Sequence, residues 1–339
     1  MLIEKRRMNG SQSNCFWKGK MEYIRNNTNF KIDEPTVLTL GKFDGLHMGH
    51  KFLFEHLIQM KKAGLKTVLF TFDRPPGNEI DQKIHLVLTT ISEKEYVFET
   101  CGIDYLIEYP FTKEVMQMDA SEFIRMLVSK LNVKAIVTGD DFRFGYQRKG
   151  DHILLEQLSK KYGFDLKVVK KKQYLGEDIS STFVRKEVVS GNMELAMMLL
   201  GYPYFIQGVV KDGNKFGRQM GIPTINLIPP QEKLMPPNGV YISKIEVDDQ
   251  TYMGISNIGI KPTIEGTHPI GVETNLFDYQ DDLYGKTVRV YFLKFLRNEK
   301  KFPTIEDLKL QIEKDIHCAR KYWEEHSFDE SYYGNITNS

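Results

Sequence analysis

The pattern of apolar runs changes near residue 202, and this change limits the folds that the chain can adopt. Before it, short apolar runs such as 36–40, 66–72 and 135–138 alternate with segments of helical spacing. Such alternation predicts βαβ units and a parallel sheet. After it, strand-like runs follow one another without helices between them, which predicts an antiparallel barrel or sandwich. The chain is therefore expected to contain two domains of different architecture.

The expected boundaries follow from these patterns. Along the 339 residues we expect a poorly ordered extension (1–34), a first domain (35–186), a linker helix (187–202), a second domain (203–330) and a tail (331–339). Met21 is a possible natural start, because the residues before the first clear strand are polar and lack periodicity.

Capping residues predict where three helices begin. Ser92 with Glu95, and Asp119 with Glu122, have the spacing of a capping box. Thr304 is the expected N-cap of a closing helix. The apolar face of that helix consists of Ile305, Leu308, Ile312, Ile316 and Ala319.

Charge and cysteine content exclude several classes of protein. Lys and Arg total 46 and Asp and Glu total 45, a net charge of +1 that is too balanced for binding nucleic acid through bulk electrostatics. No apolar run reaches about 18 residues, so no transmembrane helix is expected. Cys15, Cys101 and Cys318 are too scattered for a disulfide framework or a cysteine zinc site. We expect a cytoplasmic protein without nucleic-acid or membrane partners.

The segment from Gly41 to His50, between the first strand and the first helix, favours phosphate binding. Its glycines permit close backbone approach, and the following helix begins with free N–H groups. His47 and His50 are three residues apart, so both rings can reach one anion on the first helical turn. The alternatives are a structural turn and half of a zinc site, for which no further ligands are evident.

Three other polar segments also follow predicted strands or begin helices. Residues 71–76 and 139–150 lie at carboxyl ends of strands, where open α/β sheets bind ligands. The second of these is equally compatible with a plain polar loop. Ser180, Ser181 and Thr182 precede a helical run that contains Arg185, a pattern that either caps the helix or holds phosphate.

The second half of the chain has its own nucleotide-binding pattern. Thr224 and Asn226 are two residues apart, so on an extended strand both side-chain oxygens face one side and suit Mg²⁺. Glu273 lies in a strand and is either a general base or a solvated surface charge. Glycines 213, 217 and 221 suggest a flap that approaches a ligand closely. There is no Walker A motif, which excludes a P-loop kinase.

The order and spacing of these motifs resemble the bifunctional prokaryotic riboflavin kinase/FMN adenylyltransferase (FAD synthetase) family. The resemblance covers about residues 36–325 and is carried by GKFDGLHMGH, TGDDFRFGYQRKGD, ISSTFVRKEVVSGN, GVVKDGNKFGRQMGIPTIN, PPNGVYISKI, GISNIGIKPT, VETNLFDYQDDLYG and LRNEKKF. It implies a Rossmann-like α/β nucleotidyltransferase of the HxGH type, followed by a six-stranded antiparallel Greek-key β-barrel with a C-terminal helix. It also implies two reactions, from riboflavin and ATP to FMN, and from FMN and ATP to FAD and pyrophosphate.

For the first domain, the resemblance implies that His47 and His50 bind ATP phosphates and stabilise the transition state. The other implied phosphate-binding residues are Gly41, Asp44, Gly45, Ser180, Ser181, Thr182 and Arg185. The implied nucleotide and flavin pocket contains Asp141, Phe142, Phe144 and Arg148. Two positions differ from the usual family pattern, with Lys42 in place of Asn and Asp73-Arg74-Pro75-Pro76 in place of Pro-His-Pro.

For the second domain, the resemblance implies that Glu273 takes the proton from the ribityl hydroxyl while Thr224 and Asn226 coordinate Mg²⁺. The implied ATP-binding residues are Lys211, Gly213, Gly217 and Gly221, and the implied flavin-binding residues are Tyr284, Arg297 and Phe302. Two alternatives are a riboflavin kinase with a weak or repurposed first domain, and a flavin-binding regulator without turnover. The expected oligomeric state is a monomer or weak oligomer.

Overall fold

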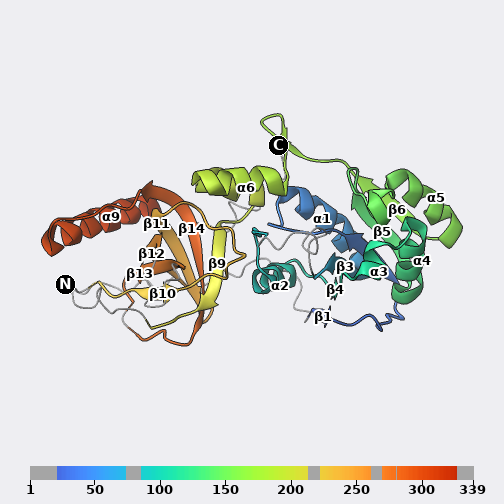
Figure 1. Cartoon of the computed structure of the whole chain (residues 1–339), viewed down its shortest axis with the longest axis horizontal. Coiled ribbons are helices and arrows are strands. Elements are labelled where there is room, and N and C mark those ends of the chain that lie inside the picture. The colour runs from blue at the N-terminus through green and yellow to red at the C-terminus, as the bar shows by residue number, and fades with distance from the viewer. Residues whose placement is uncertain (1–20, 74–84, 213–221, 261–268, 280, 327–339) are drawn as a thin grey trace. The chain divides into compact units, whose positions relative to one another are not determined.

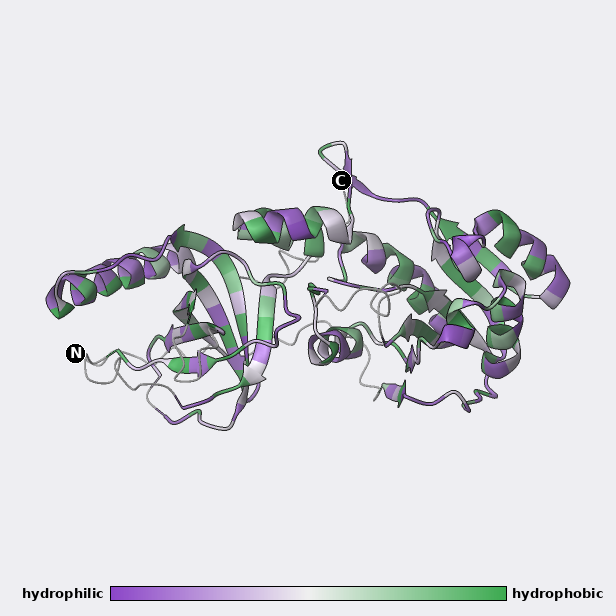
Figure 2. Ribbon diagram, viewed as in Figure 1, coloured by the Kyte–Doolittle hydropathy of each residue, from purple (hydrophilic) through white to green (hydrophobic). Residues whose placement is uncertain are grey.

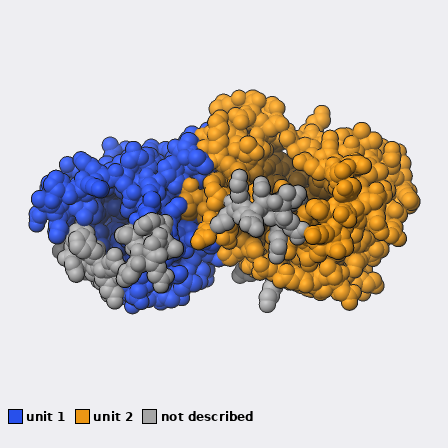
Figure 3. Space-filling model, viewed as in Figure 1, with its two compact units in different colours: residues 1–16, 188–230, 236–339 blue, residues 17–187, 231–235 orange. Residues whose placement is uncertain are grey.

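The computed structural model describes residues 21–73, 85–212, 222–260, 269–279 and 281–326. These residues form two compact units. Of the described residues, one unit comprises those within 21–187 together with 231–235. The other comprises those within 188–230 and 236–326 (Figure 3). In the described residues, no helix is long and apolar enough to cross a membrane.

The first unit contains a six-stranded sheet in which every neighbouring pair is parallel (Figure 1). Its order is β1 (Glu22–Arg25), β4 (Tyr105–Tyr109), β3 (Lys66–Phe72), β2 (Thr36–Leu40), β5 (Val133–Gly139) and β6 (Asp165–Val169). All five residues of β2 are buried, as expected for a central parallel strand with both faces covered. This arrangement confirms the predicted α/β domain.

Helices pack around this sheet, and their ends follow from capping residues. The helices are α1 (Met48–Lys62), α2 (Ile91–Thr100), α3 (Lys113–Met116), α4 (Ala120–Leu131) and α5 (His152–Tyr162). The predicted cap at Asp119 is confirmed, since its carboxylate accepts from the N–H groups of Ser121 and Glu122. The prediction for α2 was wrong by two residues, because the capping box is formed by Thr90 and Glu93.

Residues 21–34 differ from the expected poorly ordered extension. Residues 22–25 form β1, which pairs in parallel with β4. Phe30 and Ile32 are buried in the main hydrophobic cluster of the unit. Scattered apolar residues gave no periodic signal here, because an edge strand of four residues and two isolated core side chains are too short to show one. Residues 1–20 lie outside the described residues.

The described part of the second unit contains a six-stranded antiparallel sheet, curled into a half-barrel, which confirms the predicted class of its fold. Its order is β10 (Ile225–Leu227), β13 (Ile270–Leu276), β12 (Gln250–Ile260), β11 (Gly239–Val247), β14 (Thr287–Arg297) and β9 (Tyr204–Val209). An isolated bridge between Lys211 and Asn226 joins the chain just after β9 to β10, so the two edges of the sheet meet there. Hydrophobic stretches of these strands are green in Figure 2.

The remaining helices complete the two units. The predicted helical run after residue 180 is divided by Gly191 into α6 (Ser181–Ser190) and α7 (Met193–Leu200). The closing helix α9 (Ile305–Glu325) begins as predicted, because the Thr304 side chain accepts from the N–H of Asp307. Shorter elements are η1 (Tyr146–Arg148), β7 (Gln173–Tyr174) and β8 (Glu177–Asp178).

Candidate functional site

The turn between β2 and α1 has an unusual backbone. Phe43, Gly45 and Leu46 have positive φ values of 45°, 81° and 41°. Positive φ is unfavourable for Phe and Leu, and such strain persists only where surrounding structure holds it. Here the Phe43 and Leu46 side chains are 1% and 2% exposed, so core packing holds the turn. Strained backbone of this kind clusters at functional sites.

His47 and His50 lie together at the start of α1. Their rings stack with centroids 3.8 Å apart. Gly49 makes room for this arrangement, because a Cβ at that position would lie 3.0 Å from Nδ1 of His47. The Nδ1 atom of each ring is buried without a hydrogen-bond partner, which is uncommon outside functional sites. The structure thus brings together the two histidines that the spacing predicted.

Both imidazoles are neutral at pH 7. Burial lowers the pKa of His47 to about 4, although Asp44 and Asp141 partly oppose this change. Burial also lowers the pKa of His50 well below its usual value, and the neighbouring His47 and Lys94 act in the same direction. The two rings therefore meet a ligand as neutral hydrogen-bonding groups.

Asp44 connects the turn to two other segments of the first unit. Its Oδ1 accepts from the N–H groups of Leu88 and Thr89 at 2.9 and 3.2 Å. Its Oδ2 pairs with the guanidinium of Arg185, and its carbonyl accepts from Ser181 Oγ at 2.7 Å. Asp44 and Ser181, at the start of α6, are 137 residues apart in sequence, yet they are in direct contact.

These contacts give Arg185 and the hydroxyls definite structural partners. Arg185 also donates to the carbonyl of Leu86 at 2.7 Å, so its guanidinium links the turn to the segment before α2. Ser180 Oγ accepts from the N–H of Phe183, which makes it a helix cap. Thr182 is exposed. Among the three predicted hydroxyls, Ser181 contacts the turn itself through the carbonyl of Asp44.

A set of cations surrounds the turn. Lys94, on the first turn of α2, donates from Nζ to the carbonyl of Lys42 at 3.3 Å. Desolvation lowers the pKa of Lys42, and Arg148 and Arg185 lie close enough to lower it further. Sequence patterns did not single out Lys94, because it looks like an ordinary charge on an amphipathic helix. Its Nζ contact places Lys94 against the turn between β2 and α1.

The segment after β5 divides between core and surface. Phe142 and Phe144 stack with centroids 5.4 Å apart, and Phe144 is 5% exposed in the hydrophobic core. The Phe144 ring packs where Gly150 leaves space, and its contact with flavin stays a prediction. Arg148 is exposed with a φ of 58°. Asp141 pairs with Lys171 at 3.1 Å.

In the second unit, three predicted residues occupy one row across the antiparallel sheet. Lys211 bridges to Asn226, and Asn226 lies directly opposite Glu273 on β13. Asn257 on β12 lies opposite Glu273 on its other side. Directly opposite residues in an antiparallel pair present their side chains to the same face. Glu273 is exposed on that face between two amides, of which Asn257 was missed because only strand register shows it.

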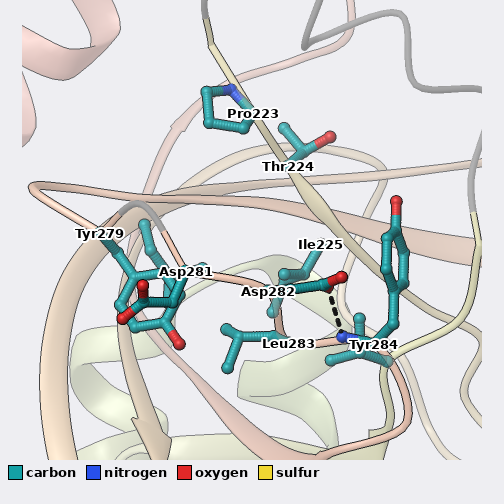
Figure 4. Close-up of a pocket in the computed structure, with 10 residues that line it drawn as sticks. Pro223, Thr224, Ile225, Tyr279, Asp281, Asp282, Leu283 and Tyr284 are labelled. Atoms are coloured by element: carbon teal, nitrogen blue, oxygen red, sulfur yellow. Dashed lines mark hydrogen bonds between the residues drawn. The ribbon is translucent and has the colours of Figure 1, made fainter.

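A cavity of about 460 Å³ lies beside Thr224 (Figure 4). Its apolar wall contains Val210, Pro223, Ile225, Leu276 and Leu283, and its polar side contains Thr224, Tyr279, Asp281, Asp282 and Tyr284. The Tyr284 N–H donates to Asp282 Oδ1 at 2.9 Å, which fixes the loop that carries the tyrosine. The shape and lining suit a flat ring with a polar edge.

Arg297 and Phe302 do not line this cavity. The Arg297 guanidinium forms three hydrogen bonds of 2.8 to 3.1 Å with Asp315 of α9. Asp315 is 5% exposed, and Phe302 lies beneath the guanidinium with 5.8 Å between charge and ring centroid. Arg297 therefore holds α9 against the end of β14, a partner that the sequence pattern did not reveal. Predicted residues Gly213, Gly217, Gly221 and Arg74 to Pro76 lie outside the described residues.

Comparison with known proteins separates the same two halves. The family model for FAD synthetase matches residues 29–183, and the model for riboflavin kinase matches residues 200–323. The chain is 38% identical over 312 residues to the bifunctional riboflavin kinase/FMN adenylyltransferase of Buchnera aphidicola from Acyrthosiphon pisum, covering 90% of this chain and 99% of that protein. The corresponding Escherichia coli K12 protein is 36% identical over 294 residues, covering 86% and 93%.

A solved structure also resembles the chain. A Streptococcus pneumoniae protein described as a macrolide-efflux protein aligns with a TM-score of 0.79 and 31% identity, covering 88% of this chain and 98% of that one. The description as an efflux protein belongs to that Streptococcus pneumoniae protein and is not extended to this chain.

An HxGH turn on a parallel sheet and a Thr, Asn and Glu set on a six-stranded antiparallel sheet define a two-domain transferase that uses nucleotides. The chain belongs to the bifunctional riboflavin kinase/FMN adenylyltransferase family. Its C-terminal domain is a riboflavin kinase and its N-terminal domain is an FAD synthetase adenylyltransferase. The predicted family, reactions and substrates are confirmed, and neither alternative, a repurposed first domain or a flavin-binding regulator, is favoured.

Proposed function

We propose that adenylyl transfer takes place at the turn between β2 and α1. The observation that carries this assignment is the stacked, neutral pair of His47 and His50. The FMN phosphate attacks the α-phosphorus of ATP in line, and pyrophosphate leaves. Neutral imidazole N–H groups and the N-terminus of α1 donate to phosphate oxygens, while Lys42 and Lys94 balance the charge that moves onto pyrophosphate.

The kinase reaction is assigned to the row of Lys211, Asn226, Glu273 and Asn257. Glu273 takes the proton of the ribityl 5′-hydroxyl as the oxygen attacks the γ-phosphorus of ATP. Asn226 and Asn257 flank its carboxylate and orient it. This assignment depends on the strand register, which sets the three side chains on one face.

Mg²⁺ fits the same surface. Thr224 and Asn226 are two residues apart and offer neutral side-chain oxygens. Mg²⁺ keeps several waters and binds ATP phosphates, so it needs few ligands from the protein. No group of three or more His, Cys, Asp or Glu residues suited to a metal occurs among the described residues, which agrees with a site shared with substrate. When bound, Mg²⁺ neutralises the charge on the ATP phosphates.

Replacing Asn226 tests the metal assignment. In Asn226→Ala, we expect the Mg²⁺ concentration for half-maximal FMN formation to rise about tenfold, because one of the few protein ligands is lost. Magnesium titration of both reactions gives the measurement, with Asn298→Ala as an amide control outside this row. An unchanged magnesium requirement in Asn226→Ala would contradict the assignment.

The cavity beside Thr224 is proposed to take the adenine of the ATP used by the kinase. Its wall shares Thr224 with the metal site, whereas Arg297 and Phe302, two of the three residues predicted to bind flavin, lie elsewhere. This placement moves Tyr284 from the predicted flavin side to the nucleotide side.

Tyr284→Ala tests whether Tyr284 contacts the ATP or the flavin. Loss of one aromatic wall is expected to raise the KM for ATP about tenfold in FMN formation, with the KM for riboflavin changed less than threefold. Steady-state kinetics with each substrate varied in turn provides the test. A selective increase in the riboflavin KM would return Tyr284 to the flavin side.

The proposed cellular setting is the cytoplasm, with the enzyme acting as a monomer or weak oligomer. The wide separation of Cys15, Cys101 and Cys318 in the sequence is in keeping with a reducing compartment.

A further inference from the structure

A segment from the second half of the sequence belongs to the first unit. Residues 231–235 lie in the chain between β10 and β11, which are strands of the kinase sheet, but they group with residues 17–187 (Figure 3). Val87 forms a parallel bridge with Lys233, with hydrogen bonds of 2.6 Å to the carbonyl of Glu232 and 2.8 Å from the N–H of Leu234. The segment is thus hydrogen-bonded to the loop before α2.

Lys233 enters the interior of this unit with its charge paired. Its Nζ donates to Glu93 Oε2 at 2.8 Å and to the carbonyl of Leu88 at 2.7 Å. The side chains of Lys233 and Glu93 are each 1% exposed. A buried lysine is stable only with such partners, because transfer of an unpaired charge from water is very costly.

The loop that Lys233 holds is the same loop that supports the catalytic turn. The carbonyl of Leu88 accepts from Lys233, while the N–H groups of Leu88 and Thr89 donate to Asp44. Thr89 Oγ1 also accepts from the N–H of Gly45 at 3.1 Å. Leu88 is therefore fixed by Lys233 through its carbonyl and by the turn through its N–H.

Glu93 connects Lys233 to the start of α2. Its carboxylate accepts from the N–H of Thr90 at 2.8 Å, completing the capping box, and from Lys233 through the same oxygen. The next residue is Lys94, whose Nζ reaches the carbonyl of Lys42. Lys94 is thus a cation beside the proposed phosphate site. Its position depends on the start of α2, which Lys233 anchors through Glu93.

We propose that Lys233, from the kinase half of the sequence, is a positioning residue for adenylyl transfer. It holds the loop 88–90 and the start of α2, and through them it sets Asp44 and Lys94 around the turn. The inference depends on the proposed placement of adenylyl transfer at that turn. His50→Ala tests the placement separately.

The test compares variants of the full-length enzyme in FAD formation from FMN. In Lys233→Met, we expect kcat to fall and the KM for ATP to rise, lowering kcat/KM about 10- to 100-fold through misplacement of binding groups. FMN formation from riboflavin should stay within about twofold. Lys233→Arg should recover most of the loss, and Lys309→Met, an exposed lysine on α9, should match the parent.

A double variant separates positioning from stability. Glu93→Met/Lys233→Met removes both buried charges, and such replacements often preserve folding. Because the Leu88 carbonyl still lacks its donor, FAD formation should remain low in the double variant, with folded protein verified by circular dichroism. Wild-type kcat and KM in folded Lys233→Met, or full recovery in the double variant, would overturn the proposal. If His50→Ala is inactive in FAD formation while folded Lys233→Met is not, the turn assignment stands and only the positioning role fails.

Discussion

Glu273→Gln should lower kcat for FMN formation from riboflavin by about 10²- to 10⁴-fold, the usual contribution of a general base. The amide has nearly the shape of the carboxylate but cannot accept the proton of the ribityl hydroxyl. Glu273 is exposed on the sheet face between Asn226 and Asn257, so the substitution places no new polar group in the core. Chromatographic separation of flavins after incubation with ATP and Mg²⁺ measures the effect.

The same preparation should convert added FMN to FAD at the parental rate, because Glu273 is in the other unit from the proposed adenylyl-transfer turn. Glu313→Gln, an exposed glutamate on α9, is the matched control and should retain both reactions. A loss of FMN formation below about tenfold would contradict the role of Glu273 as base. Loss of both reactions in folded protein would contradict the assignment of the two reactions to different units.

Local sequence patterns predicted the features that depend on short-range interactions, namely one turn and the ends of helices. Glycines and the two histidines indicated the turn at 41–50, because a strand end, backbone freedom and the first helical turn are all short-range properties. The cap at Asp119 followed in the same way. For α2, Ser92 and Thr90 are both acceptable caps in sequence, and the capping interaction with Glu93 is what selects Thr90.

Contacts between distant segments were beyond such patterns. Arg185 looked like a phosphate ligand, but its partner Asp44 is 141 residues away. The sequence analysis did not single out Lys233, because nothing near it in sequence indicates burial against Glu93. For Phe144, the Gly-rich loop did not indicate that the ring packs in the hydrophobic core.

Strand register decided the kinase site. Thr224 and Asn226 could be paired from their spacing on one strand, but Glu273 joins them only through the β10 to β13 register. Asn257 enters the site through the β12 to β13 register. A slip of one residue in either pair would turn these side chains to opposite faces. The proposed catalytic set of the kinase therefore depends on the strand register of the folded sheet.

His50→Ala should lower kcat for FAD formation from FMN by about 10²- to 10³-fold, the effect of losing one preorganised donor to a developing charge. FMN formation should be unchanged, and His56→Ala, further along α1, is the matched control. His50→Gln should retain more activity than His50→Ala, because its amide can still donate a hydrogen bond. Flavin chromatography with FMN as substrate measures these rates.

The pH dependence distinguishes a neutral imidazole from a cation at this position. Burial lowers the pKa of His50 well below 6.5, so the free enzyme already holds the ring neutral at pH 6 and above. The kcat/KM for ATP in FAD formation should therefore show no step near pH 6.5 that depends on His50. A step there in the parent that disappears in His50→Gln would mean that an imidazolium binds the phosphates. It would also mean that burial of the His50 ring against His47 and near Lys94 does not hold its pKa well below the usual value in the free enzyme.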